Sequence, residues 1–380
     1  YLYSENQIIN NFLKFKKVFK KTNPLICFAA KSNSNVSILK TLGKLGAGTD
    51  VVSGGELLKA LKAGIKPNKV VFSGIGKNED ELRIAINKKI LLINCESESE
   101  AKLVDKIARK LRKKVSIGFR LNPNIDAKTH QKISTGKAEN KFGLSIKNFK
   151  SFYKSIKKYK NINLDALSVH IGSQILSDVP YKKMLNVMSN LIKELKLDLK
   201  FLDLGGGFGI RYNEKDKPIN LKKYSDSVYK LAKKLKCKII FEPGRSIIGD
   251  TGILLSKIQY IKKGAKKDFI IIDAGMNDFM RPALYDAVHK IIPIRKSKSK
   301  LKGTIEFVGP ICESTCKFGS YKNYQKMSEN DFVAITNVGA YGSSLSSNYN
   351  SRPLIAELLV NKNKIKYIRK KQDLLKLINS

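Results

Sequence analysis

One lysine in this sequence stands where a buried strand is expected to end. The segment Leu25-Ile-Cys-Phe-Ala-Ala-Lys-Ser-Asn33 runs from six apolar residues straight into Lys31. Such an unbroken apolar run is typical of a parallel-sheet strand that is buried on both faces. A lysine at its end is partly desolvated, which disfavours the ammonium form and favours a nucleophilic amine. Taken alone, the pattern fits equally a lysine that leaves the sheet edge for water.

Further candidate site residues follow other apolar segments in the same way. They are Asp50 in Asp50-Val-Val-Ser-Gly-Gly-Glu56, His170 and Ser173 in His170-Ile-Gly-Ser-Gln174, Gly206 and Gly207 in Gly205-Gly-Gly-Phe-Gly209, and Gly244 and Arg245 in Glu242-Pro-Gly-Arg245. In a parallel barrel the carboxyl ends of all strands meet on one rim, so these groups are predicted to lie together.

A glycine cluster lets backbone N–H groups approach a phosphate, although alone it also fits a tight strand-to-helix turn. Arg245 adds charge to the same region. A lysine nucleophile, a phosphate site and an acid on one rim together indicate pyridoxal 5'-phosphate. Lys31 would carry the cofactor, Glu242 would pair with its pyridine nitrogen, and His170 would stack on its ring, unless His170 is only a rim histidine.

The elements that must position these residues alternate regularly. Apolar segments occur at 25–30, 49–52, 69–72, 90–94, 115–121, 166–170, 201–204 and 238–241. Stretches with helical periodicity lie between most of them, at 36–45, 55–63, 79–87, 99–111 and 181–195. This alternation predicts βαβ units, and eight of them fit an α/β fold with a (β/α)8 TIM-type barrel over residues 1–250. A doubly wound open sheet is the alternative.

The character of the chain changes after Gly249, where helical periodicity fades. Strand-like runs follow at 252–261, 269–273, 303–308, 331–336, 354–360 and 364–368. They predict a mostly β domain over residues 251–380, a sandwich or barrel, with which the first few residues of the chain could pair.

Composition limits the remaining classes of function. The 380 residues, 42% of them hydrophobic, suffice for two domains, and the apolar runs are strand-sized, so we expect neither a transmembrane helix nor a signal peptide. Five irregularly spaced cysteines and three histidines favour a reducing, cytoplasmic location and no metal site. Because the sequence begins with Tyr1, we expect the natural chain to start earlier.

The formal net charge of +41 raises the question of a nucleic acid or an anionic membrane as partner. The lysines are spread over nearly every predicted helix and form no single basic face with interleaved aromatic residues. We therefore expect solvated helix faces, no membrane partner and no specific nucleic acid.

The chain resembles the group IV decarboxylases, pyridoxal phosphate enzymes with an alanine-racemase-like barrel, and most closely their diaminopimelate decarboxylase branch. The resemblance covers nearly the whole chain. It rests on Ala30-Lys-Ser-Asn33, His130-Gln-Lys-Ile-Ser-Thr-Gly136 with Lys141-Phe-Gly143, Asp273-Ala-Gly-Met-Asn277, Arg281-Pro-Ala-Leu-Tyr285, Gly309-Pro-Ile-Cys-Glu-Ser314, Gly339-Ala-Tyr-Gly342 and Asn350-Ser-Arg-Pro353.

The resemblance implies decarboxylation of meso-2,6-diaminopimelate to L-lysine, the last step of lysine biosynthesis, by a homodimer with shared active sites. Lys31 would form the Schiff base, and Cys312 of the partner subunit would protonate the substrate carbon. In the family such a cysteine acts as an acid, whereas most cysteines are small buried hydrophobes. Tyr341 would touch the cofactor phosphate and the substrate.

The same resemblance assigns the distal end of the substrate, an amino-acid group, to Arg281, Tyr285 and Glu313, with Arg245 also near the substrate. An arginine for the carboxylate and a carboxylate for the ammonium match that end in charge. Decarboxylases of ornithine, lysine or arginine, an amino acid racemase and a non-catalytic relative remain as alternatives. One departure stands out: the family usually has Asp where this chain has Cys316.

Overall fold

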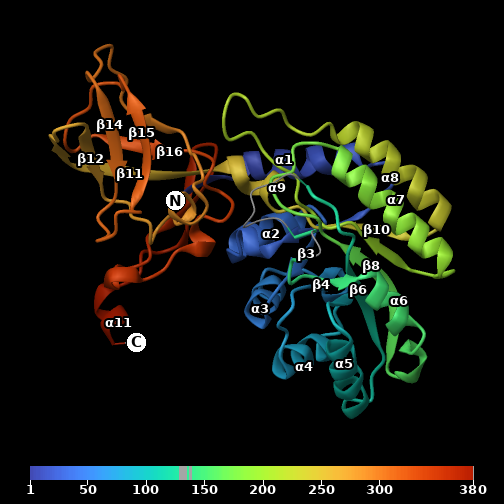
Figure 1. The fold of residues 1–380 in the computed structure, drawn as a ribbon. Coiled ribbons are helices and arrows are strands. Elements are labelled where there is room, and N and C mark those ends of the chain that lie inside the picture. Colours follow the sequence, from blue (N-terminus) through green and yellow to red (C-terminus); the bar gives the residue numbers. More distant parts are fainter. Residues whose placement is uncertain (128–134, 137–138, 380) are drawn as a thin grey trace. The chain divides into compact units, whose positions relative to one another are not determined.

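The structure is a computed structural model that describes residues 1–127, 135–136 and 139–379. The chain divides into two compact units. The barrel unit comprises Ile9–Ile210 and Lys217–Ile247, and the β unit comprises Tyr1–Ile8, Arg211–Asp216 and Ile248–Ser380. Both units are visible in Figure 1.

Within the described residues of the barrel unit, eight parallel strands form a closed ring. They are β2 (Leu25–Ala29), β3 (Gly48–Val51), β4 (Val70–Phe72), β5 (Leu92–Cys95), β6 (Val115–Asn122), β8 (Ile162–Val169), β9 (Phe201–Asp203) and β10 (Lys238–Phe241). The last strand of the ring, β10, pairs with the first, β2, with Ile240 opposite Leu25, and β5 pairs with β6, so the ring is closed. The predicted barrel is confirmed, and the open-sheet alternative is wrong.

Four consecutive strands of the ring, β2 to β5, are only three to five residues long and are buried throughout. In β2 all five residues are buried. A cluster of buried side chains draws on five strands of the ring: Leu25, Cys27, Val71, Leu92, Ala166 and Ile240. Interdigitating side chains from many strands fill a barrel of this size, so the ring is a packed core with chemistry at its ends.

Helices lie around the outside of the ring (Figure 1). They are α1 (Glu5–Val18), α2 (Val36–Lys44), α3 (Gly54–Lys62), α4 (Glu79–Asn87), α5 (Glu98–Lys110), α6 (Ile146–Tyr153), α7 (Val179–Glu194), α8 (Leu221–Leu235) and α9 (Arg245–Ile248). Polar caps fix where several begin: Asn78 and Glu81 form a capping box at α4. No helix in the described part of the chain is both long and apolar enough to cross a membrane.

The β unit is mostly sheet, as predicted. Its elements are β1 (Leu2–Ser4), β11 (Gly252–Lys262), β12 (Asp268–Ile272), α10 (Arg281–Tyr285), β13 (Ile291–Pro293), β14 (Thr304–Val308), β15 (Lys317–Lys322), β16 (Phe332–Ile335), β17 (Glu357–Asn361), β18 (Lys364–Arg369) and α11 (Leu374–Ile378). The main path of the sheet runs β15-β14-β12-β11-β1-β17-β18, and β16 joins β11 to β13.

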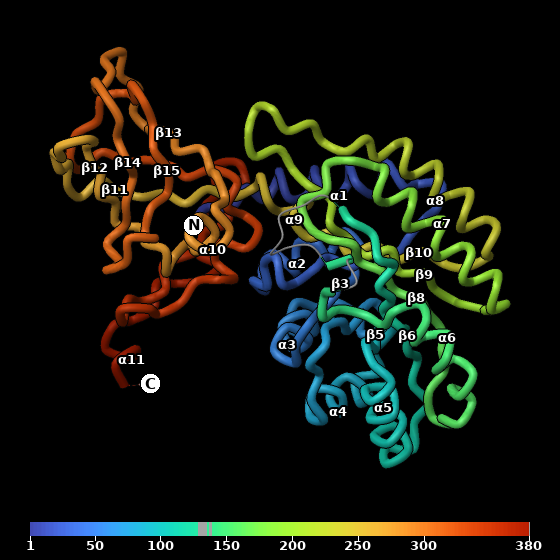
Figure 2. The backbone as a smooth tube through the Cα atoms, viewed as in Figure 1, coloured from blue at the N-terminus to red at the C-terminus, as the bar shows by residue number. Residues whose placement is uncertain are grey.

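Strand β1 is the first in the chain, yet it lies inside the sheet of the β unit (Figure 2). Leu2 pairs in antiparallel fashion with Ile253 of β11 and in parallel fashion with Leu358 of β17. Strands β13 and β15 were not predicted.

Candidate active site

Lys31 lies in a single 3-10 turn, Ala30–Ser32, directly after β2. Its Nζ donates a hydrogen bond to Oδ2 of Asp50 over 3.0 Å, and the lysine side chain is 38% exposed while that of Asp50 is fully buried. The lysine is therefore half-buried, as expected for a strand end. The carboxylate beside it favours the ammonium form, an effect that opposes desolvation.

Asp50 belongs to a group of three buried acids at or near the carboxyl ends of β3, β9 and β10. Glu242 follows β10, and Asp203 is the last residue of β9. Burial, and then the charges of Asp203 and Asp50, raise the pKa of Glu242 well above its usual range. Burial also raises the pKa of Asp203, and a side-chain hydrogen bond joins it to Glu242.

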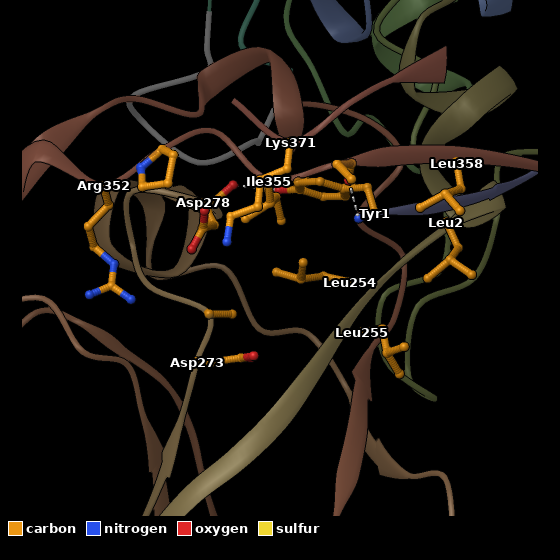
Figure 3. A pocket seen from close by; sticks show the side chains of 13 residues that line it. Tyr1, Leu2, Leu254, Leu255, Asp273, Asp278, Arg352, Ile355, Leu358 and Lys371 are labelled. Carbon is orange, nitrogen blue, oxygen red and sulfur yellow. Dashed lines mark hydrogen bonds between the residues drawn. The ribbon is translucent and has the colours of Figure 1, made fainter. Parts of the chain in front are cut away.

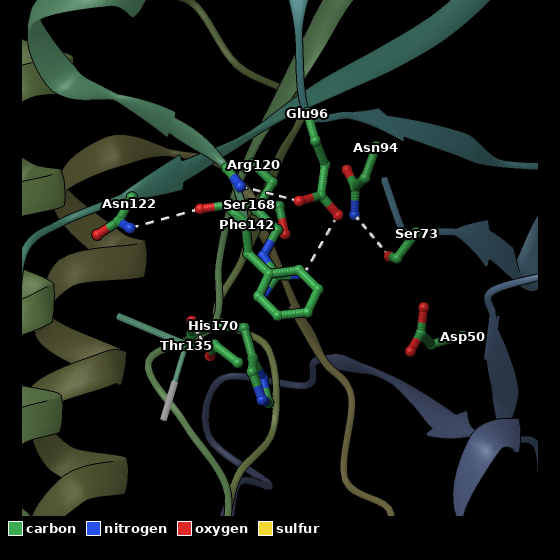
Figure 4. Close-up of polar contacts among 12 residues, drawn as sticks. Asp50, Ser73, Asn94, Glu96, Arg120, Asn122, Thr135, Phe142, Ser168 and His170 are labelled. Carbon is green, nitrogen blue, oxygen red and sulfur yellow. Dashed lines mark hydrogen bonds and ion pairs between the residues drawn. The ribbon is translucent and has the colours of Figure 1, made fainter. Parts of the chain in front are cut away.

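Neutral side chains hold Asp203 and Glu242 in place, and Figure 4 shows the hydrogen bond between two of them, Asn94 and Ser73. Asn94 Nδ2 donates to Asp203 Oδ2 at 2.9 Å and to Ser73 Oγ at 3.3 Å. Ser73 Oγ in turn donates to Glu242 Oε1 at 3.3 Å. In the described part of the chain, the second oxygen of Asp50, Oδ1, is buried without a hydrogen-bond partner. Such an atom is costly unless a ligand completes it.

His170 directly follows β8, and its ring is bound to the glycine loop after β9. The N–H of Gly206 donates to His170 Nδ1 at 3.2 Å, which leaves the remaining ring proton on Nε2. Burial, and then the charges of Arg120 and Lys31, lower the pKa of His170 well below its usual range. A neutral imidazole is therefore presented at the rim, and its flat face is suited to stacking.

The loop after β9 depends on glycine at two positions. Gly207 has φ = +88°, a conformation that other residues rarely adopt. A Cβ at Gly206 would overlap the carbonyl oxygen of Glu242. The backbone of this loop therefore packs directly against the strand end that carries Glu242.

Arg245 begins α9 in the loop after β10. It is buried, and its Nη2 donates to Ser173 Oγ at 3.1 Å. Gly244 precedes it, where a Cβ would come within 2.9 Å of Ser32 Oγ, next to Lys31. Arg245 is thus bound to Ser173, and Gly244 packs against the residue that follows Lys31.

Two rim residues of the barrel were not singled out from the sequence. Arg120 on β6 forms an ion pair with Glu96 at 3.3 Å, and its guanidinium lies 4.8 Å from the centre of the Phe142 ring. Glu96 also accepts the N–H of Gly143 at 2.9 Å. The only sequence signal was a charged residue inside a strand-like run. Of the motif 130–136, residues 130–134 lie outside the described residues.

In the β unit, α10 carries two of the predicted substrate residues, Arg281 and Tyr285, at its two ends. Arg281 is buried, and its Nη1 donates to the hydroxyl of Tyr212 at 2.6 Å. Tyr212 was not predicted, because nothing in the sequence around it marks a contact with Arg281. Tyr341 has φ = +57°, unusual for a tyrosine, which is a feature often found at functional sites.

Cys312 and Glu313 lie on the loop between β14 and β15. Cys312 is exposed, so it is not the small buried hydrophobe that most cysteines are, and its N–H donates to Asn350 Oδ1 at 3.4 Å. Glu313 Oε1 accepts the hydroxyl of Tyr349 at 2.6 Å. Cys316 is buried, and its Sγ accepts the N–H of Met276 at 3.3 Å.

The β unit also contains a cavity of about 370 Å³ (Figure 3). Charged and apolar side chains line it together, among them Asp273, Asp278, Arg352, Leu254 and Leu358. Burial raises the pKa of Asp278. None of the predicted cofactor or substrate residues is among the described residues that line this cavity, so it is separate from the predicted site.

Comparison with known proteins agrees with this arrangement. Residues 5–249 match the family model described as "Pyridoxal-dependent decarboxylase, pyridoxal binding domain". The diaminopimelate decarboxylase of Aquifex aeolicus strain VF5 is 42% identical over 376 residues, which cover 98% of this chain and 89% of that protein. That of Helicobacter pylori strain J99 is 44% identical over 377 residues, covering 98% and 93%.

Solved structures show the same relationship. The crystal structure of the Helicobacter pylori diaminopimelate decarboxylase complexed with L-lysine has a TM-score of 0.93 and 43% identity, covering all of this chain and 95% of that one. A lysine/ornithine decarboxylase from Vibrio vulnificus, complexed with cadaverine, has a TM-score of 0.82 at 18% identity, which is a likeness of fold alone.

The class that the barrel, its rim and the family match define is that of the pyridoxal-dependent decarboxylases. Within this class, the chain belongs to the diaminopimelate decarboxylase family. The resemblance described from the sequence and the expectation of an enzyme of this type are thereby confirmed.

Proposed function

We propose that this enzyme converts meso-2,6-diaminopimelate to L-lysine and CO2, the last step of lysine biosynthesis, with pyridoxal 5'-phosphate as cofactor. The observation that carries the proposal is the gathering of Lys31, Asp50 and Glu242 at the carboxyl ends of β2, β3 and β10. These residues belong to a chain that is 44% identical to a diaminopimelate decarboxylase over 98% of its length.

The residues present fit the cofactor. Asp50 accepts a hydrogen bond from the amine of Lys31, and the charge of Lys31 also acts on the buried Glu242. The second oxygen of Asp50, Oδ1, has no hydrogen-bond partner among the described residues. Such an acidic setting suits a ring that becomes positively charged. The glycine loop, Ser173 and Arg245 offer donors for a phosphate.

When bound, pyridoxal phosphate supplies an electron sink for the charge that remains as CO2 leaves. Lys31 would hold the cofactor covalently through Nζ. Glu242, whose pKa is raised by burial and then by Asp203 and Asp50, would hydrogen-bond to the ring nitrogen. His170, neutral and fixed by Gly206, would cover one face of the ring and help to exclude water.

The β unit would recognise the end of the substrate that does not react. That end bears an ammonium and a carboxylate, so its recognition requires one negatively charged and one positively charged side chain in fixed places. We assign the carboxylate to Arg281, with Arg245 also near the substrate, and the ammonium to Glu313. Tyr285 and Tyr341 would add hydroxyl contacts, Tyr341 to the cofactor phosphate as well.

Cys312 would deliver the proton that replaces the lost carboxylate, from its Sγ–H to the substrate carbon. Its exposure supports this role, because a buried thiol could not reach a substrate. We propose that it acts across the interface of a homodimer, so that each active site combines residues 1–250 of one subunit with residues of the 251–380 domain of the other.

The test is CO2 release by the purified protein with added pyridoxal phosphate. Meso-diaminopimelate, ornithine, lysine and arginine are compared side by side at equal concentration. Release from meso-diaminopimelate alone is the expected result, because the other three lack the distal carboxylate that Arg281 would bind. Release from ornithine or lysine instead would overturn the substrate assignment, and release from none would overturn the proposed activity.

A further inference from the structure

A short segment of the β unit directly continues the glycine loop of the barrel. Residues Arg211–Asp216 follow Gly205–Ile210 in the chain and belong to the β unit. The N–H of Tyr212 donates to Asp216 Oδ2 at 3.0 Å, and Asn337 Nδ2 donates to the carbonyl oxygen of Arg211 at 3.3 Å. The segment is thus closed by its own side chains and tied to the loop that follows β16.

Within this segment, Tyr212 makes two contacts with Arg281. Its hydroxyl accepts the N–H of Arg281 Nη1 at 2.6 Å, a short distance for a hydrogen bond from a charged donor. The centre of the guanidinium lies 4.9 Å from the centroid of the tyrosine ring. Because one residue holds the guanidinium both by its hydroxyl and by its ring, the orientation of that plane is fixed.

The tyrosine ring also packs against other aromatic rings of the β unit. His289 meets it edge to face at 5.1 Å, and Phe279 meets His289 in the same manner at 4.7 Å. His289 Nδ1 lies 2.9 Å from the carbonyl oxygen of Thr336. These edge-to-face ring contacts, with His289 held near the backbone of Thr336, therefore set the position of Tyr212 before any ligand binds.

We propose that Tyr212 is the positioning residue that aims Arg281 at the distal carboxylate of the substrate, and so determines selectivity for substrates that carry one. The proposal rests on the function proposed above and deepens it. Tyr212 lies five residues beyond Gly207 in the chain. The loop that would bind the cofactor phosphate and the residue that orients the substrate arginine are therefore one continuous stretch of backbone.

The chemical type of the partner supports this role. A carboxylate placed on Nη1 would neutralise the guanidinium and compete with the carboxylate of the substrate. A phenol hydroxyl accepts the hydrogen bond without adding a charge. Since guanidinium presents its five N–H donors in a rigid plane, fixing one nitrogen and the plane sets the direction of the others.

The experiment measures binding of L-lysine and of cadaverine to the holoenzyme, for wild type and Tyr212→Phe. L-lysine keeps the amino-acid end that Arg281 would bind, and cadaverine has no carboxylate. The variant keeps the ring and loses only the hydroxyl. Since a hydrogen bond to a charged group contributes about 1.5–3 kcal/mol, the dissociation constant for L-lysine should rise about tenfold or more. That for cadaverine should change less than about twofold.

Two further variants separate positioning from general damage. Tyr260→Phe removes the hydroxyl of a tyrosine that is 63% exposed, on β11, and should change neither constant. Arg281→Lys alone should weaken L-lysine binding, and adding Tyr212→Phe to it should cause almost no further loss, because the tyrosine acts through the arginine.

Equal weakening for L-lysine and cadaverine, no weakening for either, or full additivity in the double variant would overturn the proposal for Tyr212. If wild type releases CO2 from meso-diaminopimelate while any of these results holds, only the role of Tyr212 falls. If wild type neither acts on meso-diaminopimelate nor binds L-lysine, the proposed function falls first, and this inference falls with it.

Discussion

The predicted active-site residues of the barrel unit and of the β unit are held in different ways. At the barrel rim, Glu242 is buried and is fixed by Ser73, by Asp203 and by the backbone of the glycine loop. In the β unit, Cys312 and Glu313 lie on an exposed loop, where Asn350 accepts the N–H of Cys312 and the hydroxyl of Tyr349 donates to Glu313.

The difference follows from what each set has to do. Burying carboxyl groups beside one another costs free energy, so such a cluster persists only when a dense network holds it, and it is then preorganised for a fixed cofactor. Residues that meet a substrate, or another subunit, must stay accessible. The barrel rim is therefore expected to tolerate change poorly, and the β-unit loop to tolerate it well except at the atoms that react.

The largest expected effect is at Lys31, on the barrel rim. Lys31→Ala should lower CO2 release from meso-diaminopimelate by more than about a thousandfold, the scale seen when a covalent catalyst is removed. The absorbance of protein-bound pyridoxal phosphate should also lose its lysine-linked band. Lys59→Ala, an exposed lysine that contacts Ser34, is the matched control and should keep both. An unchanged spectrum in the Lys31 variant would show that the cofactor lies elsewhere.

The next largest effect tests the β-unit loop. Cys312→Ala should lower kcat about a hundredfold, because a positioned acid contributes about 10²–10⁴. Its KM and its free energy of unfolding should hardly change, since the side chain is exposed. Cys316→Ser is the control: a hydroxyl can still accept the N–H of Met276, so activity should stay within about twofold. A large loss of stability in the Cys312 variant would contradict the tolerance expected of this loop.

A smaller effect tests the backbone of the barrel rim. In Gly206→Ala the new Cβ would overlap the carbonyl oxygen of Glu242, which is main chain and cannot easily move. The free energy of unfolding, measured with urea, should fall by about 1–3 kcal/mol. At Gly76 a Cβ meets nothing within 4 Å, so Gly76→Ala should be nearly neutral. Equal stability of the two variants would mean that the rim is not rigid.

The smallest effect is a dependence of stability on pH. The pKa of Glu242 is raised above its ordinary value of 4.5, by burial first and then by Asp203 and Asp50, with Lys31 opposing. The folded cofactor-free protein thus keeps a proton that the unfolded chain releases. The contribution of Glu242 to the free energy of unfolding is fully present below pH 4.5 and is lost as the pH rises through the pKa of Glu242 in the folded protein.

Glu242→Gln cannot lose that proton. Relative to wild type, its free energy of unfolding should therefore rise as pH increases from about 5 to about 8, in urea titrations without cofactor. Glu214→Gln alters an exposed side chain and should show no such trend. A constant difference between wild type and the Glu242 variant would mean that the acid cluster is already ionised.

The barrel was predictable because its signal is local. Each strand is a short buried run, each helix has its own apolar stripe, and residue types that react lie where the runs stop. Closure of the ring by β2 and β10 could only be inferred from the number of repeats, since this pairing joins the first and the last strand of the ring, which lie far apart in the chain. Strand β15 was missed because it is polar and only sparsely buried, with Phe318 as its one buried residue.

The contacts that complete the site were harder to foresee. Asp203 was included in a predicted strand, but its neighbours Asn94 and Glu242 come from other strands of the ring. The contact of Tyr212 with Arg281 joins residues 69 apart in the chain, so no spacing could reveal it. Sequence patterns thus indicate which residues reach the rim, while tertiary packing decides which of them touch.

The pairing of β1 has a consequence for how the chain is made. Tyr3 in β1 is fully buried, and its hydroxyl donates to Glu357 Oε2, 354 residues later in the sequence. At a synthesis rate of about 5–20 residues per second, β1 waits roughly twenty to seventy seconds for β17 to be made. During that time its aromatic side chains and one strand edge are uncovered, which is the condition that favours aggregation and chaperone binding. The barrel unit, whose strands are all complete by Phe241, can fold well before the sheet that contains β1 is closed.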